Sequence, residues 1–124
     1  MTTRNERHEA LFNTFVSAFL HKDLAQVAQC LAPHFAWRLP SGETYTGKEN
    51  ALAFMAKRFA DPNGPEFLDS SLAFHGDTVI QTYHVKAMGA NGKRQVVAGL
   101  DVYKIEEGLI IFKDAYWKQL TSGL

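Results

Sequence analysis

The sequence has few of the residues that build disulfide frameworks and metal sites. Its single cysteine, Cys30, excludes an internal disulfide, and we expect it to be a small buried apolar residue rather than a nucleophile. The five histidines show neither H-x-x-x-H nor H-E-x-x-H spacing. We therefore expect no metal centre and no cofactor.

An excess of charge of one sign and a long hydrophobic run are also missing. Thirteen basic residues balance thirteen acidic ones, without a basic run, which argues against nucleic acid or an anionic membrane as the partner. No stretch approaches the length of a membrane span, and residues 1–10 lack the apolar core of a signal peptide. The expectation is a soluble, cytoplasmic protein with one domain over residues 1–124.

Apolar and aromatic side chains are abundant instead. They make up 46% and 12% of the chain, and nine of them are phenylalanines. This is rich for a soluble protein of this length and leaves apolar surface to line a cavity or an interface between subunits.

The segment 93–119 predicts two long strands around a turn at residues 106–108, because apolar and polar residues alternate on both sides of a glycine. If Ile105 faces Leu109, then Asp101 lies opposite Lys113 on a face that is otherwise apolar. A buried carboxylate must be paired, hydrogen-bonded or neutralised, so this ionisable pair is the most unusual feature of the sequence.

The first half of the chain predicts three helices and one hairpin. Apolar residues at helical spacing predict a helix over 6–20 and a short second helix that begins after Asp23 and ends at Pro33. Alternation from His34 predicts a strand, with a short edge strand at 43–46. A third helix follows residues 47–49, and the loop 61–65 after it is the best candidate for a mobile flap.

Two further strands are predicted at 66–74 and 78–88, with Val79, Tyr83 and Val85 facing the core. A bulge would reverse that assignment. The element order is α+β, with a curved antiparallel sheet whose helices cover one face and leave a cone open at one end. The other face carries an apolar patch that predicts a sheet-to-sheet homodimer, made of Val96, Ala98, Leu100, Val102, Ile110 and Phe112.

Three stretches carry a resemblance to a known family: HKDL between the first two helices, FAWRLPSGETYTGKENALAFM, and the hairpin GLDVYKIEEGLIIFKDAYWK. They resemble the nuclear transport factor 2-like superfamily, and within it the ketosteroid isomerase-like and polyketide cyclase-like (SnoaL-like) branch. The resemblance covers nearly the whole chain and implies a cystatin-like cone of antiparallel sheet wrapped around three helices. It does not define a function, because this fold hosts isomerases, dehydratases, epoxide hydrolases, cyclases and binding modules.

The resemblance places Asp101 at the position of the ketosteroid isomerase acid that donates a hydrogen bond to a developing enolate, a carboxylic acid that burial keeps neutral. It places Phe15 where that enzyme has a tyrosine donor, and Leu39 where it has its general base. Neither residue can replace the missing group, so steroid isomerisation by that mechanism is not expected. The hairpin carboxylate of the epoxide hydrolases would fall on Ala115.

Two interpretations of Asp101 and Lys113 stay open. They form a structural ion pair that neutralises itself, or Asp101 acts as a base or orients water while Lys113 holds an anionic intermediate. A lysine stem that snorkels to the rim would instead leave Asp101 alone.

Aromatic residues are the candidates for lining a ligand pocket, although most aromatics at such spacings belong to a core. We expect a mostly apolar, flat ligand with one or two oxygens, held by Phe15, Phe19, Trp37, Leu39, Tyr83, Tyr103 and Trp117. The resemblance to dehydratases raises the alternative that His75 and His84 meet over the pocket, whereas surface positions are more common for such histidines. His34 is a weaker candidate. Arg38 is expected to face outward and Arg58 to lie on a solvated helix face.

The sequence thus predicts a protein that binds a small apolar carbonyl-containing or aromatic metabolite and isomerises, dehydrates or hydrolyses it without a cofactor. Asp101 and Lys113 would carry the chemistry. The alternative is a carrier or dimerisation module without catalysis, in which the two charges neutralise each other.

Overall fold

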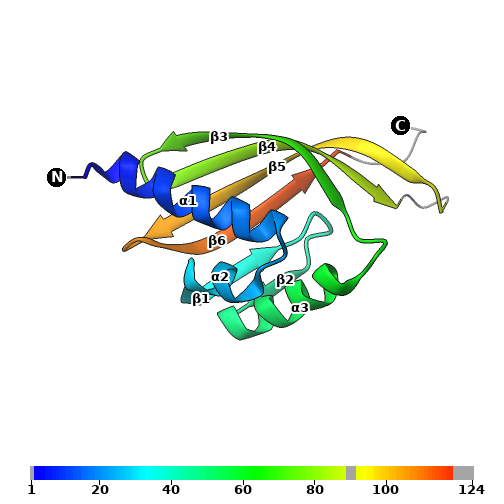
Figure 1. The fold of residues 1–124 in the computed structure, drawn as a ribbon, viewed down its shortest axis with the longest axis horizontal. Coiled ribbons are helices and arrows are strands. Elements are labelled where there is room, and N and C mark those ends of the chain that lie inside the picture. Colours follow the sequence, from blue (N-terminus) through cyan, green and yellow to red (C-terminus); the bar gives the residue numbers. More distant parts are fainter. Residues whose placement is uncertain (1, 89–91, 119–124) are drawn as a thin grey trace.

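The structure, a computed structural model, describes residues 2–88 and 92–118. Its elements follow one another as α1 (Arg4–Leu20), α2 (Leu24–Gln29), β1 (Leu31–Arg38), β2 (Thr44–Thr46), α3 (Lys48–Ala60), β3 (Glu66–His75), β4 (Thr78–Met88), β5 (Arg94–Glu106) and β6 (Leu109–Trp117) (Figure 1). This α+β order, with three helices around one short hairpin and then four strands, confirms the prediction.

The helix starts follow from capping. Thr3 and Glu6 form a reciprocal capping box, which starts α1 two residues earlier than predicted. The Asp23 side chain accepts from the backbone N–H of Gln26 and so starts α2. The predicted end of α2 at Pro33 is wrong, because the chain turns at Cys30 and already runs as β1 from Leu31. None of the helices that the structure describes is both long and apolar enough to cross a membrane.

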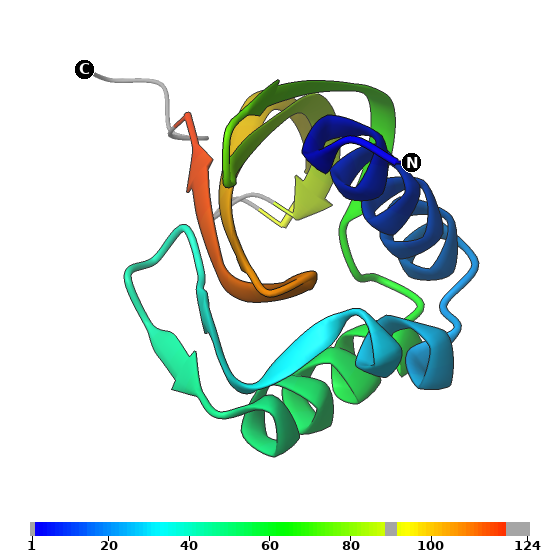
Figure 2. The ribbon, with the colours of Figure 1, turned by 90° about the vertical axis from the view of Figure 1, so that its left-hand side faces the viewer.

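The six strands form one sheet in the order β2-β1-β6-β5-β4-β3. Neighbours from β3 to β6 pair antiparallel as predicted, and so do β1 and β2. The sheet is thus mostly antiparallel, and its one parallel neighbour pair among the described strands is β1 with β6. Seen from one end, the sheet curls strongly around the interior of the molecule (Figure 2).

The closing hairpin exists, but its predicted register is wrong. Glu106 pairs with Leu109, so the turn has two residues, Glu107 and Gly108, both with positive φ. Ile105 then pairs with Ile110, and a bulge follows before the ladder continues with Lys104 opposite Phe112. The predicted strand end at Gln119 lies outside the described residues.

The bulge has two consequences. Beyond it the register is displaced by two residues, so Tyr103 and not Asp101 lies opposite Lys113, while Asp101 lies opposite Ala115. A shift by two keeps every side chain on its predicted face. On the turn side the shift is one residue, and Ile110, predicted on the outer face, is fully buried in the core.

The core lies between the concave face of the sheet and the helices. Phe12 and Phe15 of α1 pack edge-on against Tyr103 of β5, with ring centroids 4.9 and 5.6 Å apart. Val79, Tyr83 and Val85 face inward as predicted. Cys30 is buried as expected, and burial raises the pKa of its thiol.

Candidate functional site

The inner face of the sheet carries a buried ion pair. Asp101 on β5 is 1% exposed and Lys113 on β6 is 4% exposed. Lys113 Nζ donates to Asp101 Oδ2 at 2.6 Å, although the two residues sit diagonally across the strands and not opposite each other. The lysine stem therefore does not snorkel to the rim, and the two residues predicted to meet do meet.

Two tyrosine hydroxyls also reach the Asp101 carboxylate. Tyr83 Oη donates to Oδ1 at 2.7 Å, and Tyr103 Oη lies 3.2 Å from Oδ2 and 2.8 Å from Oε1 of Gln81. One phenol carries one proton, so Tyr103 donates to only one of these acceptors at a time. Burial, followed by the charge of Asp101, raises the pKa of both tyrosines. Both phenols therefore stay protonated donors.

The donors around Asp101 define its chemistry. Both carboxylate oxygens accept hydrogen bonds, from a lysine and from tyrosines. A carboxyl group in these contacts acts as an acceptor, in contrast to the hydrogen-bond donor that the resemblance to ketosteroid isomerase implies at this position. The arrangement fits a base or a structural anion.

The absence of a side chain at Gly99 leaves room for a hydrogen bond between Trp117 and Tyr83. Tyr83, Gly99 and Trp117 lie in one row across β4, β5 and β6. A Cβ atom on Gly99 would lie 2.8 Å from both Tyr83 Cε1 and Trp117 Cδ1, closer than real contacts allow. With glycine there, Trp117 Nε1 donates to Tyr83 Oη at 2.8 Å and so completes a chain of donors from Trp117 through Tyr83 to Asp101.

The Lys113 ammonium lies among aromatic rings. Its Nζ is 5.3 Å from the centroid of the Trp37 ring, 5.4 Å from that of Tyr103 and 5.6 Å from that of Phe19. Ring faces at this distance stabilise a cation that has lost its water. An ammonium has three N–H donors, and within residues 2–88 and 92–118 Asp101 is its one hydrogen-bond acceptor.

The pair lines one cavity, and a second cavity lies beside that one. The inner cavity, of about 30 Å³, is lined by Phe15, Val16, Phe19, Leu20, Phe67, Leu68, Ser70, Gln81, Tyr83, Asp101, Tyr103 and Lys113. The mouth cavity, of about 350 Å³, is lined by Phe19, Leu20, Lys22, Trp37, Arg58, Phe59, Asp61, Pro62, Gly64, Pro65, Glu66, Phe67 and Arg94. Three residues, Phe19, Leu20 and Phe67, belong to both walls, so the cavities are neighbours.

Most of the predicted pocket residues lie at these cavities. Phe15, Phe19, Tyr83 and Tyr103 line the inner cavity and Trp37 lines the mouth cavity. The remaining two do not line either one. Leu39 is packed in the core, and Trp117 lies beside Tyr83, with an edge facing a shallow hollow on the outer side of the sheet.

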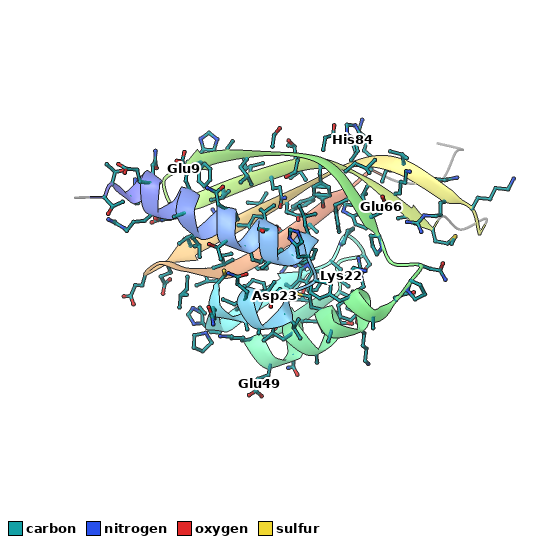
Figure 3. The ribbon with its side chains drawn as sticks, viewed as in Figure 1. Glu9, Lys22, Asp23, Glu49, Glu66 and His84 are labelled. Atoms are coloured by element: carbon teal, nitrogen blue, oxygen red, sulfur yellow. The ribbon has the colours of Figure 1, made fainter. Side chains whose placement is uncertain are left out.

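His75 and His84 do not meet over the pocket, and both lie at the surface, the position expected as the more common one. His75 ends β3 and is exposed. His84 lies on the outer side of the sheet, away from the helices, where its Nδ1 is 2.9 Å from Asp69 Oδ1 (Figure 3). Strand alternation explains this position, since His84 follows the inward-facing Tyr83. His34 is exposed as well.

Sequence reasoning missed several cavity residues. Gln81, between inward Val79 and Tyr83, lines the inner cavity and donates from Nε2 to Ser70 Oγ at 2.9 Å. The alternation of side chains along a strand predicts that Gln81 faces inward, because it lies two residues from both of these inward-facing residues. Arg58, predicted on a solvated face, is half-buried at the mouth cavity, three residues after the buried Met55. That spacing places it beside the buried stripe of α3.

The described residues contain no group of three or more His, Cys, Asp or Glu side chains that could hold a metal ion. The loop predicted as a flap, residues 61–65, lies along the mouth cavity through Asp61, Pro62, Gly64 and Pro65. Its mobility stays a prediction.

The arrangement of three helices and a strongly curved six-stranded sheet is the nuclear transport factor 2-like fold. Solved structures similar to this one include a candidate polyketide cyclase from Xanthomonas campestris pv. campestris, with a TM-score of 0.78 and 21% identity over 94% of this chain and 93% of that one. A candidate ketosteroid isomerase from Kribbella flavida has a TM-score of 0.77 and 18% identity over 96% of this chain and 83% of that one. A nuclear transport factor 2-like protein of unknown function from Burkholderia pseudomallei has a TM-score of 0.77 and 18% identity over 90% of this chain and 91% of that one.

The chain belongs to the SnoaL-like domain family, whose pattern it matches over residues 12–112. No curated protein matches it significantly. At these identities the solved structures establish the fold alone, and it is the match to the SnoaL-like family that confirms the predicted superfamily and branch.

Proposed function

We propose that this protein binds a small, mostly apolar carbonyl compound whose oxygen accepts a hydrogen bond from Lys113. The observation that carries the proposal is the buried Lys113 ammonium at the wall of the inner cavity, which has N–H donors beyond the one given to Asp101. The rest of that wall is largely apolar. Apolar walls with a few convergent polar groups are typical of small-molecule sites.

The cavity sizes suggest how such a ligand would lie. The inner cavity, about 30 Å³, has room for one water or for the oxygen end of a ligand. The mouth cavity, about 350 Å³, falls in the usual range for ligand pockets and supports the body of the ligand between Trp37, Phe59 and Phe67. Entry of the oxygen end requires Phe19 and Phe67 to part slightly.

The same pair supports proton chemistry next to the carbonyl. The Asp101 carboxylate would remove a proton from the carbon beside the carbonyl, and Lys113 would stabilise the negative charge that develops on the oxygen. If a C=C bond lies next to that carbon, returning the proton from Asp101 to its far end shifts the double bond and is an isomerisation. If the next carbon carries a hydroxyl group, returning the proton to that oxygen lets it leave as water and is a dehydration. Both reactions need a base and an oxyanion donor and no cofactor.

Two neutral ligands of equal shape test the binding step: butyrophenone, and butylbenzene, which lacks only the carbonyl oxygen. We expect protein-observed NMR to show tighter binding of the ketone, and the preference to disappear in Lys113→Met. Lys104→Met, an exposed lysine of the same hairpin, is the matched control. The carbonyl carbon-13 signal of bound butyrophenone should also move downfield, a measurement that needs no variant. Equal binding of both compounds would contradict the proposal.

Deuterium exchange distinguishes an enzyme from a non-catalytic carrier. If Asp101 acts as a base, butyrophenone in D₂O should exchange the hydrogens beside its carbonyl faster with protein than in buffer, and Asp101→Asn should abolish the acceleration. The short distance of 2.6 Å between Lys113 Nζ and Asp101 Oδ2 favours the non-catalytic carrier, because a carboxylate held by the ammonium is a weaker base. Binding without accelerated exchange would establish the carrier.

We also propose a homodimer through the outer face of β5. Val96 is 54% exposed and Leu100 36% exposed there, next to Tyr116 at 53%. The patch is smaller than predicted, because Ile110 is in the core and the Arg38 guanidinium stacks over Phe112 at 5.4 Å. Exposed apolar side chains on an open sheet face support an interface.

A further inference from the structure

The mouth cavity has an excess of basic side chains. Lys22, Arg58 and Arg94 line it together with two acidic residues, Asp61 and Glu66. Lys22, in the turn between α1 and α2, and Glu66, at the start of β3, line this one cavity, and both are labelled in Figure 3. The question is which of these charges are already paired.

Four of the five charged groups are paired or exposed. Arg94 Nη2 is 3.8 Å from Glu66 Oε2 and donates to the carbonyl of Gly64. Asp61 accepts from the backbone N–H of Asn63, and Lys22 is exposed to water. These contacts leave Arg58 as the group to be explained.

Arg58 is half-buried and lacks an acceptor. Its guanidinium stacks over the Phe54 ring at 5.6 Å, and among the residues that the structure describes it has no hydrogen bond and no carboxylate within ion-pair distance. Burial lowers the pKa of this group, whereas the charge of Asp61 acts in the opposite direction. A guanidinium has five N–H donors in a planar fork suited to carboxylates.

A second donor at the same cavity is also unsatisfied. Trp37 is 4% exposed and lines the mouth cavity, and its Nε1–H is shielded from solvent without an acceptor among residues 2–88 and 92–118. Buried polar groups normally have partners, so an orphaned donor needs an explanation. Trp37 also contacts the Lys113 ammonium, which links the mouth to the ion pair.

Among the residues that the structure describes, the donors left without an acceptor at the two cavities are Lys113 inside, and Arg58 and Trp37 at the mouth. Their complement is a ligand with acceptor oxygens at both ends and a negative charge at the outer one. We propose that the ligand is a keto acid, with its ketone at Lys113 and its carboxylate at Arg58. This inference rests on the proposed function and adds the class of compound.

A matched pair of probes tests the role of the charge. The 4-oxo-4-phenylbutanoate ion and its amide have the same shape and the same ketone and differ in the carboxylate. We expect the wild-type protein to bind the acid about tenfold more tightly than the amide, the size of one charge-assisted hydrogen bond. This comparison requires no variant, so it holds even if a substitution disturbs folding.

Variants then locate the effect. Arg58→Gln should weaken binding of the acid about tenfold and change binding of the amide less than about twofold, and Arg58→Lys should keep part of the preference. Arg38→Gln is the control, because Arg38 is exposed on the outer face, where it stacks over Phe112 and donates to Thr44.

Each result has one meaning. Equal affinity for acid and amide, or an Arg58→Gln variant that weakens both equally, would overturn the keto-acid inference while leaving ketone binding intact. A preference for the acid that persists in Arg58→Gln would overturn the role of Arg58. If neither probe nor butyrophenone bound at all, the proposed function and this inference would fall together.

Discussion

Replacing Lys113 by methionine tests whether the buried pair acts as a unit. Methionine has nearly the shape of the lysine stem, so packing against Phe19 and Trp37 is kept while the charge is removed. Asp101, 1% exposed, then remains without its cation. Breaking a buried pair on one side costs about 3–5 kcal/mol, and the two tyrosine hydroxyls that remain place the expected loss near 3 kcal/mol. At about 4 °C per kcal/mol, the melting temperature falls by about 12 °C.

The assay is urea unfolding followed by circular dichroism, for the wild type, both single variants and the double variant. Asp101→Asn should also destabilise the protein, by leaving the ammonium unpaired. The double variant should be more stable than the sum of the two losses implies, with a coupling of about 2 kcal/mol. Lys104→Met, at an exposed side chain that bonds Thr78, should change stability by less than about 0.5 kcal/mol. Losses that simply add, or a Lys113→Met loss below about 1 kcal/mol, would refute the coupled pair.

Three other features lead to separate measurements. Burial raises the pKa of Tyr103 above the value of about 10 that it has when unfolded, so the free energy of unfolding decreases as the pH rises through 10. In urea titrations, Tyr103→Phe should make the decrease between about pH 10 and 11 smaller by about 1 kcal/mol. An unchanged decrease would contradict this. Gly99→Ala should lower the free energy of unfolding by about 1–3 kcal/mol, because the new Cβ would lie 2.8 Å from the Trp117 ring. The near-ultraviolet circular dichroism of Trp117 should change as well. An unaltered spectrum would mean that a methyl group fits between Tyr83 and Trp117. Leu100→Lys should convert the proposed dimer to a monomer in analytical ultracentrifugation, whereas Lys104→Glu should not; a monomeric wild type would remove the dimer proposal.

Much of the fold could be predicted because its signals are local. Helical spacing in residues 6–20 and alternation in 78–88 each depend on neighbours within a few residues, and both predictions agree with the structure. Alternation also placed Asp101 and Lys113 on the inner face, and that assignment survived a wrong register because the displacement was an even number of residues.

The errors concern contacts between distant segments. The bulge at Ile111 interrupts the pairing of β5 and β6 close to the turn, and the neighbouring Ile110 is buried. The parallel pairing of β1 with β6 joins segments more than seventy residues apart, and periodicity carries no information about it. The periodicity of α3 predicts a solvated position for Arg58, but residues 61–65 and the start of β3 line the same cavity and shield it.

The sequence by itself determined which segments are helices and strands, which side chains of the long strands face inward away from the bulge, and that a carboxylate and an ammonium share a largely apolar face. Tertiary structure alone decided that the two charges meet at 2.6 Å and that Tyr83 and Tyr103 donate to Asp101. It also decided that Lys113, Trp37 and Arg58 keep donors beside a cavity for which the described part of the chain offers no acceptor. The physical reason is the range of the forces involved. The period of a strand or helix fixes the direction of a side chain within a few residues, whereas its partners depend on how the sheet curves and on which segments close around it.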